Sequence, residues 1–400
     1  ARRRTRAGPG AMIRAFGAAL ALLAAAPAPA ADQVTPIGAG WQPTDKDERG
    51  LWLEVDELER KLRTSAFVMR DPALNAYVRG VFCRLVGEAA CAPVRIYILR
   101  TPVFNAGMYP TGMMVINSGL LLRMRSEAQL AAILGHEYTH YTNRHVIQGF
   151  RDLKRKTSVM TWLALVPVGG YAVAAALTVA QLGMIASVFT FSRGMETEAD
   201  AGSVPLMQKA GYDPAAAWRV WEQLRAEQDA TAAARQRKSR KDADGGMFNT
   251  HPPTAERLAA LKELAAKHPL GGPADDGAVR YAAALRPWWP ALVDDQVKLN
   301  DFGATDFVLG KLAEDGWTPD LLYARGELYR SHGDLAQAAG FYRQATEAPG
   351  APPEAWRGLG IVALRSGDED GGRAALGTYL KLKPDAADRS MIAMMAGETN

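Results

Sequence analysis

The motif His-Glu-X-X-His at residues 136–140 carries the clearest chemistry in this sequence of 400 residues. On a helix, positions four residues apart lie within about 40° of each other, so the imidazoles of His136 and His140 can bind one metal ion. Glu137 is then the expected general base, which accepts a proton from a water molecule. His145 lies about 140° around the helix from His140 and is expected outside the site, as an exposed or structural histidine. The motif predicts a hydrolase that binds one Zn²⁺ ion per chain and cleaves peptide bonds.

A zinc site of this kind needs a third protein ligand and an open position for water. Residues 196–200, with the sequence Glu-Thr-Glu-Ala-Asp, supply acidic side chains further along the chain. On a helix Glu196 and Asp200 share one face, whereas Glu198 points about 200° away from Glu196. We therefore expect Glu196 to be the third metal ligand and Asp200 to orient a ligand imidazole from behind. Glu198 is expected to be a solvent-exposed acid.

Hydrophobic periodicity places these motifs among helices and a small sheet. Residues 46–92 and 126–147 have helical spacing, and residues 94–99 alternate like a strand. Glycine and proline residues between 104 and 119 indicate a hairpin that ends in a second strand. We expect this second strand to form an edge of the sheet, where an extended peptide substrate adds through backbone hydrogen bonds. Its residues are Met113, Met114, Val115, Ile116 and Asn117.

The chain has two cysteines, Cys83 and Cys91. Along an unbroken helix they would lie about 12 Å apart, which is too far for a disulfide. Gly87 and Pro93 indicate that the helix ends near them, so the chain can fold back. In an exported protein this spacing favours a short-loop disulfide, with two buried free thiols as the alternative.

The N-terminal segment 1–31 indicates export. Arg14 and an apolar run at 15–26 precede Ala-Pro-Ala at 28–30, the pattern of a signal peptide that is cleaved before residue 31 or 32. Residues 1–11 are expected to precede the true start, and an apolar N-terminal helix that stays attached is the alternative. This segment holds five arginines and no acidic residue, so the formal net charge of +4 depends on it. The remainder has 42 basic and 43 acidic residues and gives no reason to expect a nucleic-acid partner.

Two further segments stand out by their charge. Residues 157–192 contain no charged side chain, and the run is long enough to span a membrane, but Pro167 divides it. We expect a helical hairpin that is buried in the protein or covers the site. Contact with a membrane surface and a true membrane span are the alternatives. Residues 226–249, with a basic run at 235–241, are expected to form a flexible solvated loop.

The C-terminal part of the sequence repeats itself. Three positions recur at one fixed spacing, namely Gly326, Gly333 and Asp334, which return as Gly360, Gly367 and Asp368. This spacing is typical of tetratricopeptide repeats, in which stacked helix pairs bury each other's faces. We expect residues 32–270 to form an α+β zincin (gluzincin-type) metalloprotease domain, mostly helical with a small sheet. A linker at 271–278 and an all-α tetratricopeptide repeat domain at 279–400 are expected to follow.

Further motifs, taken with His-Glu-X-X-His, give the sequence a family resemblance. They are N-A-x-x-x-P-x-G at 105–112, S-R-x-x-E-x-E-A-D at 192–200 and T-H-P-P-T-x-E-R at 250–257. With these motifs the sequence resembles the BepA-type periplasmic metallopeptidases, relatives of the HtpX heat-shock protease and of the CAAX prenyl endopeptidases. The resemblance implies a catalytic base and three zinc ligands, which are Glu137 and His136, His140 and Glu196.

The resemblance also assigns a role to His251, which composition alone would leave as a loop histidine. In relatives the histidine of this motif approaches the active site. It acts there as a substrate or oxyanion contact, or as an extra metal ligand that keeps the enzyme latent. Arg193 and Arg257 are expected to form local ion pairs.

The function implied by the resemblance is quality control in the cell envelope. We expect a zinc endopeptidase of the periplasm that cleaves misfolded or stalled outer-membrane proteins. Its repeats would dock substrates or the outer-membrane assembly machinery, and peripheral contact with the membrane is expected as well. The alternative from another class is a chaperone or scaffold for outer-membrane protein assembly whose protease is latent. An integral-membrane protease, resting on residues 157–192, is a third hypothesis.

Overall fold

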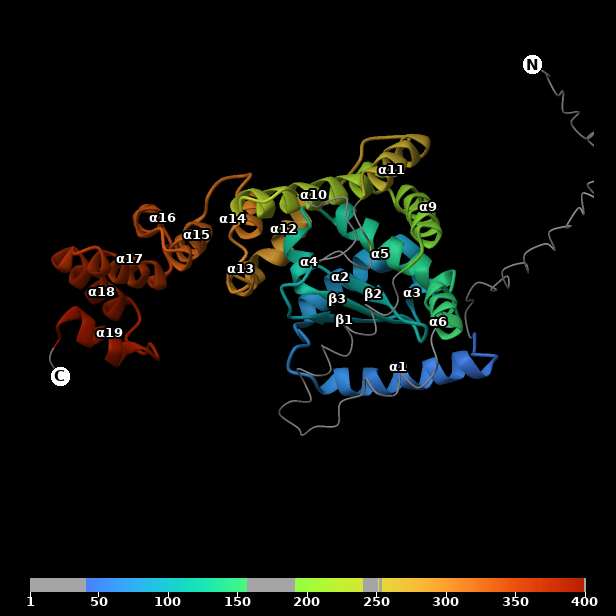
Figure 1. Ribbon diagram of the computed structural model, residues 1–400, viewed down its shortest axis with the longest axis horizontal. Helices are drawn as coiled ribbons and strands as arrows, with labels where there is room; N and C mark the ends of the chain where they lie inside the picture. Colours follow the sequence, from blue (N-terminus) through green and yellow to red (C-terminus); the bar gives the residue numbers. More distant parts are fainter. Residues whose placement is uncertain (1–40, 157–190, 240–250, 252–253, 399–400) are drawn as a thin grey trace, which may run out of the picture. The chain divides into compact units, whose positions relative to one another are not determined.

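The structure is a computed structural model of the chain, and it describes residues 41–156, 191–239, 251 and 254–398 (Figure 1). The predicted leader, almost all of the uncharged run at 157–192 and residues 240–249 of the predicted basic loop lie outside these residues. Among the helices that are described, none combines the length and the apolar character needed to cross a membrane.

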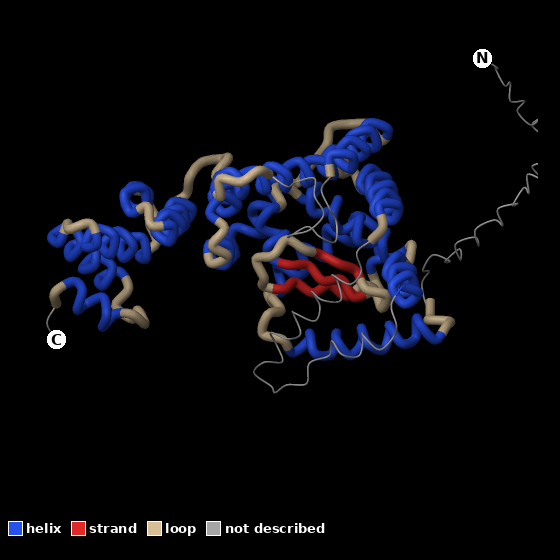
Figure 2. The backbone as a smooth tube through the Cα atoms, in the orientation of Figure 1, coloured by secondary structure: helices blue, strands red, loops and turns tan. Residues whose placement is uncertain are grey.

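A three-stranded sheet lies near the middle of the N-terminal part (Figure 2). Its strands are β1 (Arg95–Leu99), β2 (Ala106–Met108) and β3 (Met113–Asn117), in the spatial order β1-β3-β2. β3 pairs in parallel with β1 and antiparallel with β2. The prediction that Met113–Asn117 is an edge strand is therefore wrong, because β1 occupies the side of β3 that faces away from the hairpin. Within the described sheet the edges are β1 and β2.

Helices surround this sheet. Those of the N-terminal part are α1 (Lys46–Thr64), α2 (Pro72–Val86), α3 (Glu88–Cys91), α4 (Ser118–Arg123), α5 (Glu127–Thr142), α6 (His145–Lys156), α9 (Arg193–Lys209), α10 (Ala215–Ala234) and α11 (Ala255–Lys267). Those of the C-terminal part are α12 (Ala278–Leu285), α13 (Trp289–Val297), α14 (Phe302–Leu312), α15 (Pro319–His332), α16 (Leu335–Glu347), α17 (Pro353–Arg365), α18 (Glu369–Leu382) and α19 (Arg389–Ala396).

The predicted helical region at 46–92 is three helices in the structure. Asp71 starts α2 by accepting a hydrogen bond from the N–H of Leu74, and Gly87 ends it with a φ of 86° that favours glycine. The turn at Gly87 lets α3 fold back, so that Cys83 and Cys91 form a disulfide with their Cα atoms 5.0 Å apart.

Helices α2, α4 and α5 contact the sheet and share one hydrophobic core with it. Phe82, Ile98, Leu120 and Leu134 are fully buried members of this core. The core holds α5 rigidly against the sheet, which matters because α5 carries the His-Glu-X-X-His motif.

The predicted loop at 226–249 begins later than expected, because α10 continues to Ala234. Glu227 explains the extension, since its buried carboxylate binds the buried guanidinium of Arg123 on α4 at 2.6 Å. A helix can carry a polar, alanine-rich sequence this far when its inner face is held by such a contact.

The residues predicted as a linker pass close to the N-terminal core. The N–H of Ala128 on α5 donates a hydrogen bond to the carbonyl of Asp276 at 3.0 Å. Tyr281, Leu285 and Leu309, from α12 and α14, are buried in the same core as α5. Helices α12 and α14 therefore support the N-terminal part as well as preceding the repeats.

Two helix pairs, α15–α16 and α17–α18, follow the repeat seen in the sequence. Gly326 leaves room for Tyr342, and a Cβ there would lie 2.5 Å from that ring. Gly360 leaves room for Leu376 in the same way, at 2.7 Å. Since these two contacts occupy equivalent positions of the repeat, the two pairs pack alike; their membership of the tetratricopeptide family stays a prediction.

Candidate metal centre

Helix α5 holds the His-Glu-X-X-His motif and is fixed at its start by a cap. The hydroxyl of Ser126 accepts a hydrogen bond from the N–H of Gln129 at 3.2 Å. His136, Glu137 and His140, near the end of the helix, are all buried. Their spacing places both imidazoles on one face of α5.

Helix α9 crosses α5 at close range because Gly202 has no side chain. A Cβ at Gly202 would lie 2.5 Å from Cγ2 of Thr139, which is closer than real Cβ atoms approach. The hydroxyl of Ser192 caps α9 by accepting a hydrogen bond from the N–H of Met195 at 3.2 Å. This crossing brings Glu196 and Asp200, one helical turn apart and both buried, up to the histidines of α5.

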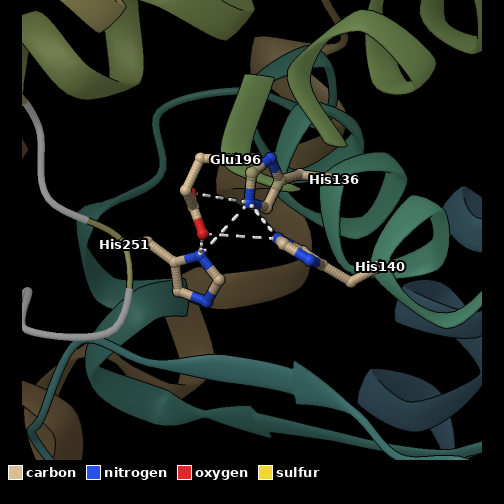
Figure 3. Close-up of side chains that lie close together, drawn as sticks. All are labelled: His136, His140, Glu196 and His251. Atoms are coloured by element: carbon tan, nitrogen blue, oxygen red, sulfur yellow. Dashed lines mark hydrogen bonds and ion pairs between the residues drawn. The ribbon is translucent and has the colours of Figure 1, made fainter. Parts of the chain in front are cut away.

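Four side chains converge on one point (Figure 3), and they are His136, His140, Glu196 and His251. One donor atom from each lies within 4.8 Å of the others. The Nε2 atoms of His136 and His140 are 3.0 Å apart. Oε2 of Glu196 lies 3.5 Å from Nε2 of His136, and Oε1 of Glu196 lies 3.5 Å from Nε2 of His140. Imidazole nitrogens and carboxylate oxygens are typical ligands of Zn²⁺, so these residues fit such an ion.

Asp200 fixes the orientation of His136. Its Oδ1 lies 2.9 Å from Nδ1 of His136, which leaves Nε2 to face the cluster (Figure 3). Arg257 binds both oxygens of Asp200 at 2.8 Å. Burial acts to raise the pKa of Asp200, but Arg257 and His136 outweigh it and lower the pKa to about 2. Asp200 is therefore negatively charged, and its carboxylate holds the imidazole of His136 in this orientation.

Arg257 also reaches the proposed ligand Glu196. Its Nη1 lies 2.9 Å from Oε2 of Glu196, and its guanidinium lies over the ring of Trp221, 4.0 Å from the centroid. Burial acts to raise the pKa of Glu196, but His251 and Arg257 hold it well below its usual range. The sequence predicted only a local ion pair for Arg257, whereas the structure places it against two carboxylates of the site. Arg193 forms an exposed pair with Glu256 at 3.6 Å.

His145 fixes the second ligand histidine. Its Nδ1 lies 2.8 Å from Nδ1 of His140, and its Nε2 lies 3.1 Å from an oxygen of Glu198. His145 lies outside the cluster of four metal-binding side chains, as expected, and it is the structural rather than the exposed histidine of the two alternatives because it is fully buried. The helical angle did not predict its contact with His140, because α5 ends at Thr142 and Arg144 takes a φ of 58° that turns the chain before α6.

Glu198 is 62% exposed, as the helical face predicted, yet its carboxylate reaches His145. This contact extends the support of His140 outward to the solvent. The sequence therefore predicted that Glu198 is exposed, but it did not predict the contact with His145.

His251 completes the cluster. Its Nδ1 lies 2.8 Å from Oε1 of Glu196 and 3.2 Å from Nε2 of His136. Its Nε2 lies 3.6 Å from Oε1 of Glu137. Burial raises the pKa of Glu137, so its carboxylate takes up a proton more readily than an exposed glutamate does.

β2 is the sheet edge that contacts α5. The N–H of Asn117 donates to the carbonyl of Asn105, and the N–H of Tyr109 donates to the carbonyl of Met113. In an antiparallel pair the bonded positions alternate, so the backbone groups of the intervening Ala106 and Met108 point away from β3. β2 is thus the edge strand beside the metal centre.

Comparison with known proteins agrees with this geometry. Residues 72–265 match the model of peptidase family M48. The chain is 29% identical over 221 residues to a putative β-barrel assembly-enhancing protease of Vibrio cholerae, a match covering 54% of this chain and 44% of that protein. It is 30% identical over 177 residues to the β-barrel assembly-enhancing protease of Escherichia coli, covering 42% and 36%. It is also 30% identical over 168 residues to the mitochondrial metalloendopeptidase OMA1 of Arabidopsis thaliana, covering 42% and 31%.

The buried cluster of His136, His140 and Glu196 fits the metal site of a metallopeptidase. The match to peptidase family M48 covers residues 72–265, and the resemblance to BepA-type proteases is confirmed. The chain spans less than half the length of these curated relatives.

Proposed function

We propose that this protein is a zinc-dependent endopeptidase. The observation that carries the proposal is the convergence of His136, His140 and Glu196 on one point, with Glu137 next to them. Two imidazoles and a glutamate are the ligand set of a recognised class of catalytic zinc sites.

When bound, the metal ion lowers the pKa of a water molecule and polarises the carbonyl of the scissile peptide bond. Glu137 accepts a proton as the water attacks the carbonyl carbon. It then delivers this proton to the amine nitrogen as the C–N bond breaks. Burial raises the pKa of Glu137, which suits a group that alternates between the two protonation states.

β2 is the strand along which we place the substrate. The outward backbone groups of Ala106 and Met108 can pair with an extended peptide in the manner of an added strand. Because β2 contacts α5, a peptide on this edge lies beside the metal centre. Extended backbone is available in unfolded or partly assembled proteins and scarce in folded ones.

The substrates we propose are misfolded or stalled proteins of the outer membrane. The names of the relatives from Vibrio cholerae and Escherichia coli, which refer to β-barrel assembly, support this class. The proposal includes export to the periplasm, docking of substrates or assembly machinery by helices α15–α18, and peripheral contact with the membrane.

A chaperone or scaffold with a latent protease is the second candidate function, and His251 favours it. A catalytic zinc site keeps one position open for water. Nδ1 of His251 lies among the other donors at 2.8 and 3.2 Å, where it would act as a fourth ligand. A side chain in that position would restrain hydrolysis until it moves.

Metal content and hydrolysis of an unfolded protein test the main proposal. The purified protein should bind one zinc ion, and Glu137→Gln should keep the metal and the fold but lose hydrolysis. His136→Ala should lose the metal, whereas the control His332→Ala, an exposed histidine of α15, should retain it. Zinc binding that survives His136→Ala would contradict the proposal.

The second candidate is separated by a different pair of variants. If the protease is latent, His251→Ala raises hydrolysis several-fold. If scaffolding is the main function, Glu137→Gln restores growth of a deletion strain as well as the wild type does. If Glu137→Gln does not restore growth, proteolysis is the function the cell requires.

A further inference from the structure

A small pocket lies next to the metal centre, on the side of His140. Its walls come from three parts of the fold that meet there: helix α1, the hairpin between β2 and β3, and the start of α6. The residues that line it from these parts are Leu51, Trp52, Met108, Pro110, Val146 and Ile147.

The lining is apolar because its charged members neutralise each other. Glu48 and Arg144 both border the pocket and form an ion pair. The guanidinium of Arg144 lies over the ring of Trp41, 4.4 Å from the centroid, so this cation also faces an aromatic surface. An occupant therefore meets aliphatic and aromatic groups rather than a free charge.

The pocket shares residues with both parts of the proposed machinery. His140 belongs to the metal cluster, and Met108 belongs to the edge strand β2. A peptide that pairs with β2 sends alternate side chains to opposite faces, and one of them is directed toward this hollow beside the metal centre. The pocket thus borders both the metal cluster, through His140, and the strand along which we place the substrate, through Met108.

We propose that this pocket binds a bulky apolar side chain of the substrate, such as Phe, Leu or Met, next to the scissile bond. The inference rests on the proposed peptidase function and names what that site selects. Large apolar side chains are mostly buried in folded proteins and become available in unfolded ones. A requirement for such a side chain would direct cleavage to misfolded chains.

The test compares two peptides that differ only in Phe or Ala beside the cleaved bond. Wild-type protein should cleave the Phe peptide with the higher kcat/KM. Leu51→Phe narrows the pocket and should reduce the Phe-to-Ala preference at least about tenfold. Leu53→Phe is the matched control, because Leu53 lies two residues along α1 and is 69% exposed, so the preference should not change.

A binding measurement keeps the pocket testable if hydrolysis is absent. Binding of fluorescently labelled peptides to the whole chain carrying Glu137→Gln is measured by fluorescence anisotropy. The Phe peptide should bind this variant more tightly than the Ala peptide does. If Leu51→Phe does not fold, Leu51→Ala replaces it and is compared on a third peptide with Trp beside the cleaved bond, which the wider pocket should favour. Equal binding and equal cleavage of the two peptides overturn the pocket. Absence of hydrolysis in both the wild type and His251→Ala, together with selective binding, overturns the peptidase function and leaves the pocket standing.

Discussion

The two ligand histidines of α5 are supported in opposite ways. Nδ1 of His136 faces Asp200, whose charge is balanced by Arg257 within the protein. Nδ1 of His140 faces His145, a neutral partner whose own support is the 62% exposed Glu198. One imidazole is fixed by a buried ionic network, and the other by a short chain of contacts that ends in solvent.

This difference implies different roles for the groups that support His136 (the His136 side) and those that support His140 (the His140 side). Buried charges are costly when one partner is removed, whereas an exposed carboxylate is easily replaced by water. We therefore expect the His136 side to determine both stability and metal binding, and the His140 side to adjust metal affinity alone. The following predictions test this division in order of decreasing effect.

Arg257→Met should have the largest effect. It leaves the buried carboxylates of Glu196 and Asp200 without their cation, and breaking a buried pair costs about 3–5 kcal/mol. Urea unfolding of the metal-free protein should show this loss, while the control Arg193→Met, which removes an exposed cation, should lose less than about 1 kcal/mol. Equal losses in the two variants would contradict a special role for Arg257.

Asp200→Asn should have the largest effect on metal affinity. The neutral amide no longer holds His136 by a charge-assisted contact, and such losses weaken binding about 10–100-fold. Competition with a zinc chelator measures the affinity. An unchanged affinity would mean that the contact of 2.9 Å does not orient the imidazole.

His145→Phe should weaken zinc binding about tenfold, at the lower end of the same range. Phenylalanine fills the buried space but offers no nitrogen to His140. The unfolding free energy should change less than in Arg257→Met. The idea fails if the chelator competition gives the wild-type value.

Glu198→Gln should have the smallest effect, at most about fivefold in zinc affinity, because exposed ion pairs contribute roughly 0–1 kcal/mol. The matched control is Glu222→Gln, an exposed pair with Lys262 that lies away from the cluster. A loss as large as that of Asp200→Asn would show that the two sides of the site are equivalent after all.

Much of the site could be predicted from the sequence because it depends on helical periodicity. His136 and His140 on α5, and Glu196 and Asp200 on α9, each lie one turn apart, and such spacing is a local property. The glycine at 87 that lets the two cysteines meet is equally local.

Other parts depend on contacts that local patterns do not encode. Alternation identified β3 as a strand, but its neighbours depend on a parallel pairing with β1 that forms only in the folded chain. Arg257 lies 57 residues from Asp200 along the chain, and His251 lies 55 from Glu196. Only the family resemblance indicated His251 before the structure did.

The contact between His145 and His140 was missed for a more specific reason. Its angle relative to His140 was calculated for one continuous helix, whereas α5 ends at Thr142 and α6 begins at His145. Asn143 was an available signal, since asparagine is common where helices end. The turn at Arg144 then places His145 beside His140 instead of away from it.

X-ray absorption at the zinc edge of the zinc-loaded protein tests the central claim most directly. We predict a first shell of nitrogen and oxygen donors at about 2.0–2.1 Å. The outer-shell scattering of the imidazoles should fall to a metal-free baseline in His136→Ala, and it should fall by one imidazole in His251→Ala if His251 is the fourth ligand. A sulfur shell, or a spectrum that both substitutions leave unchanged, would show that zinc is bound elsewhere and would contradict the metal centre described here.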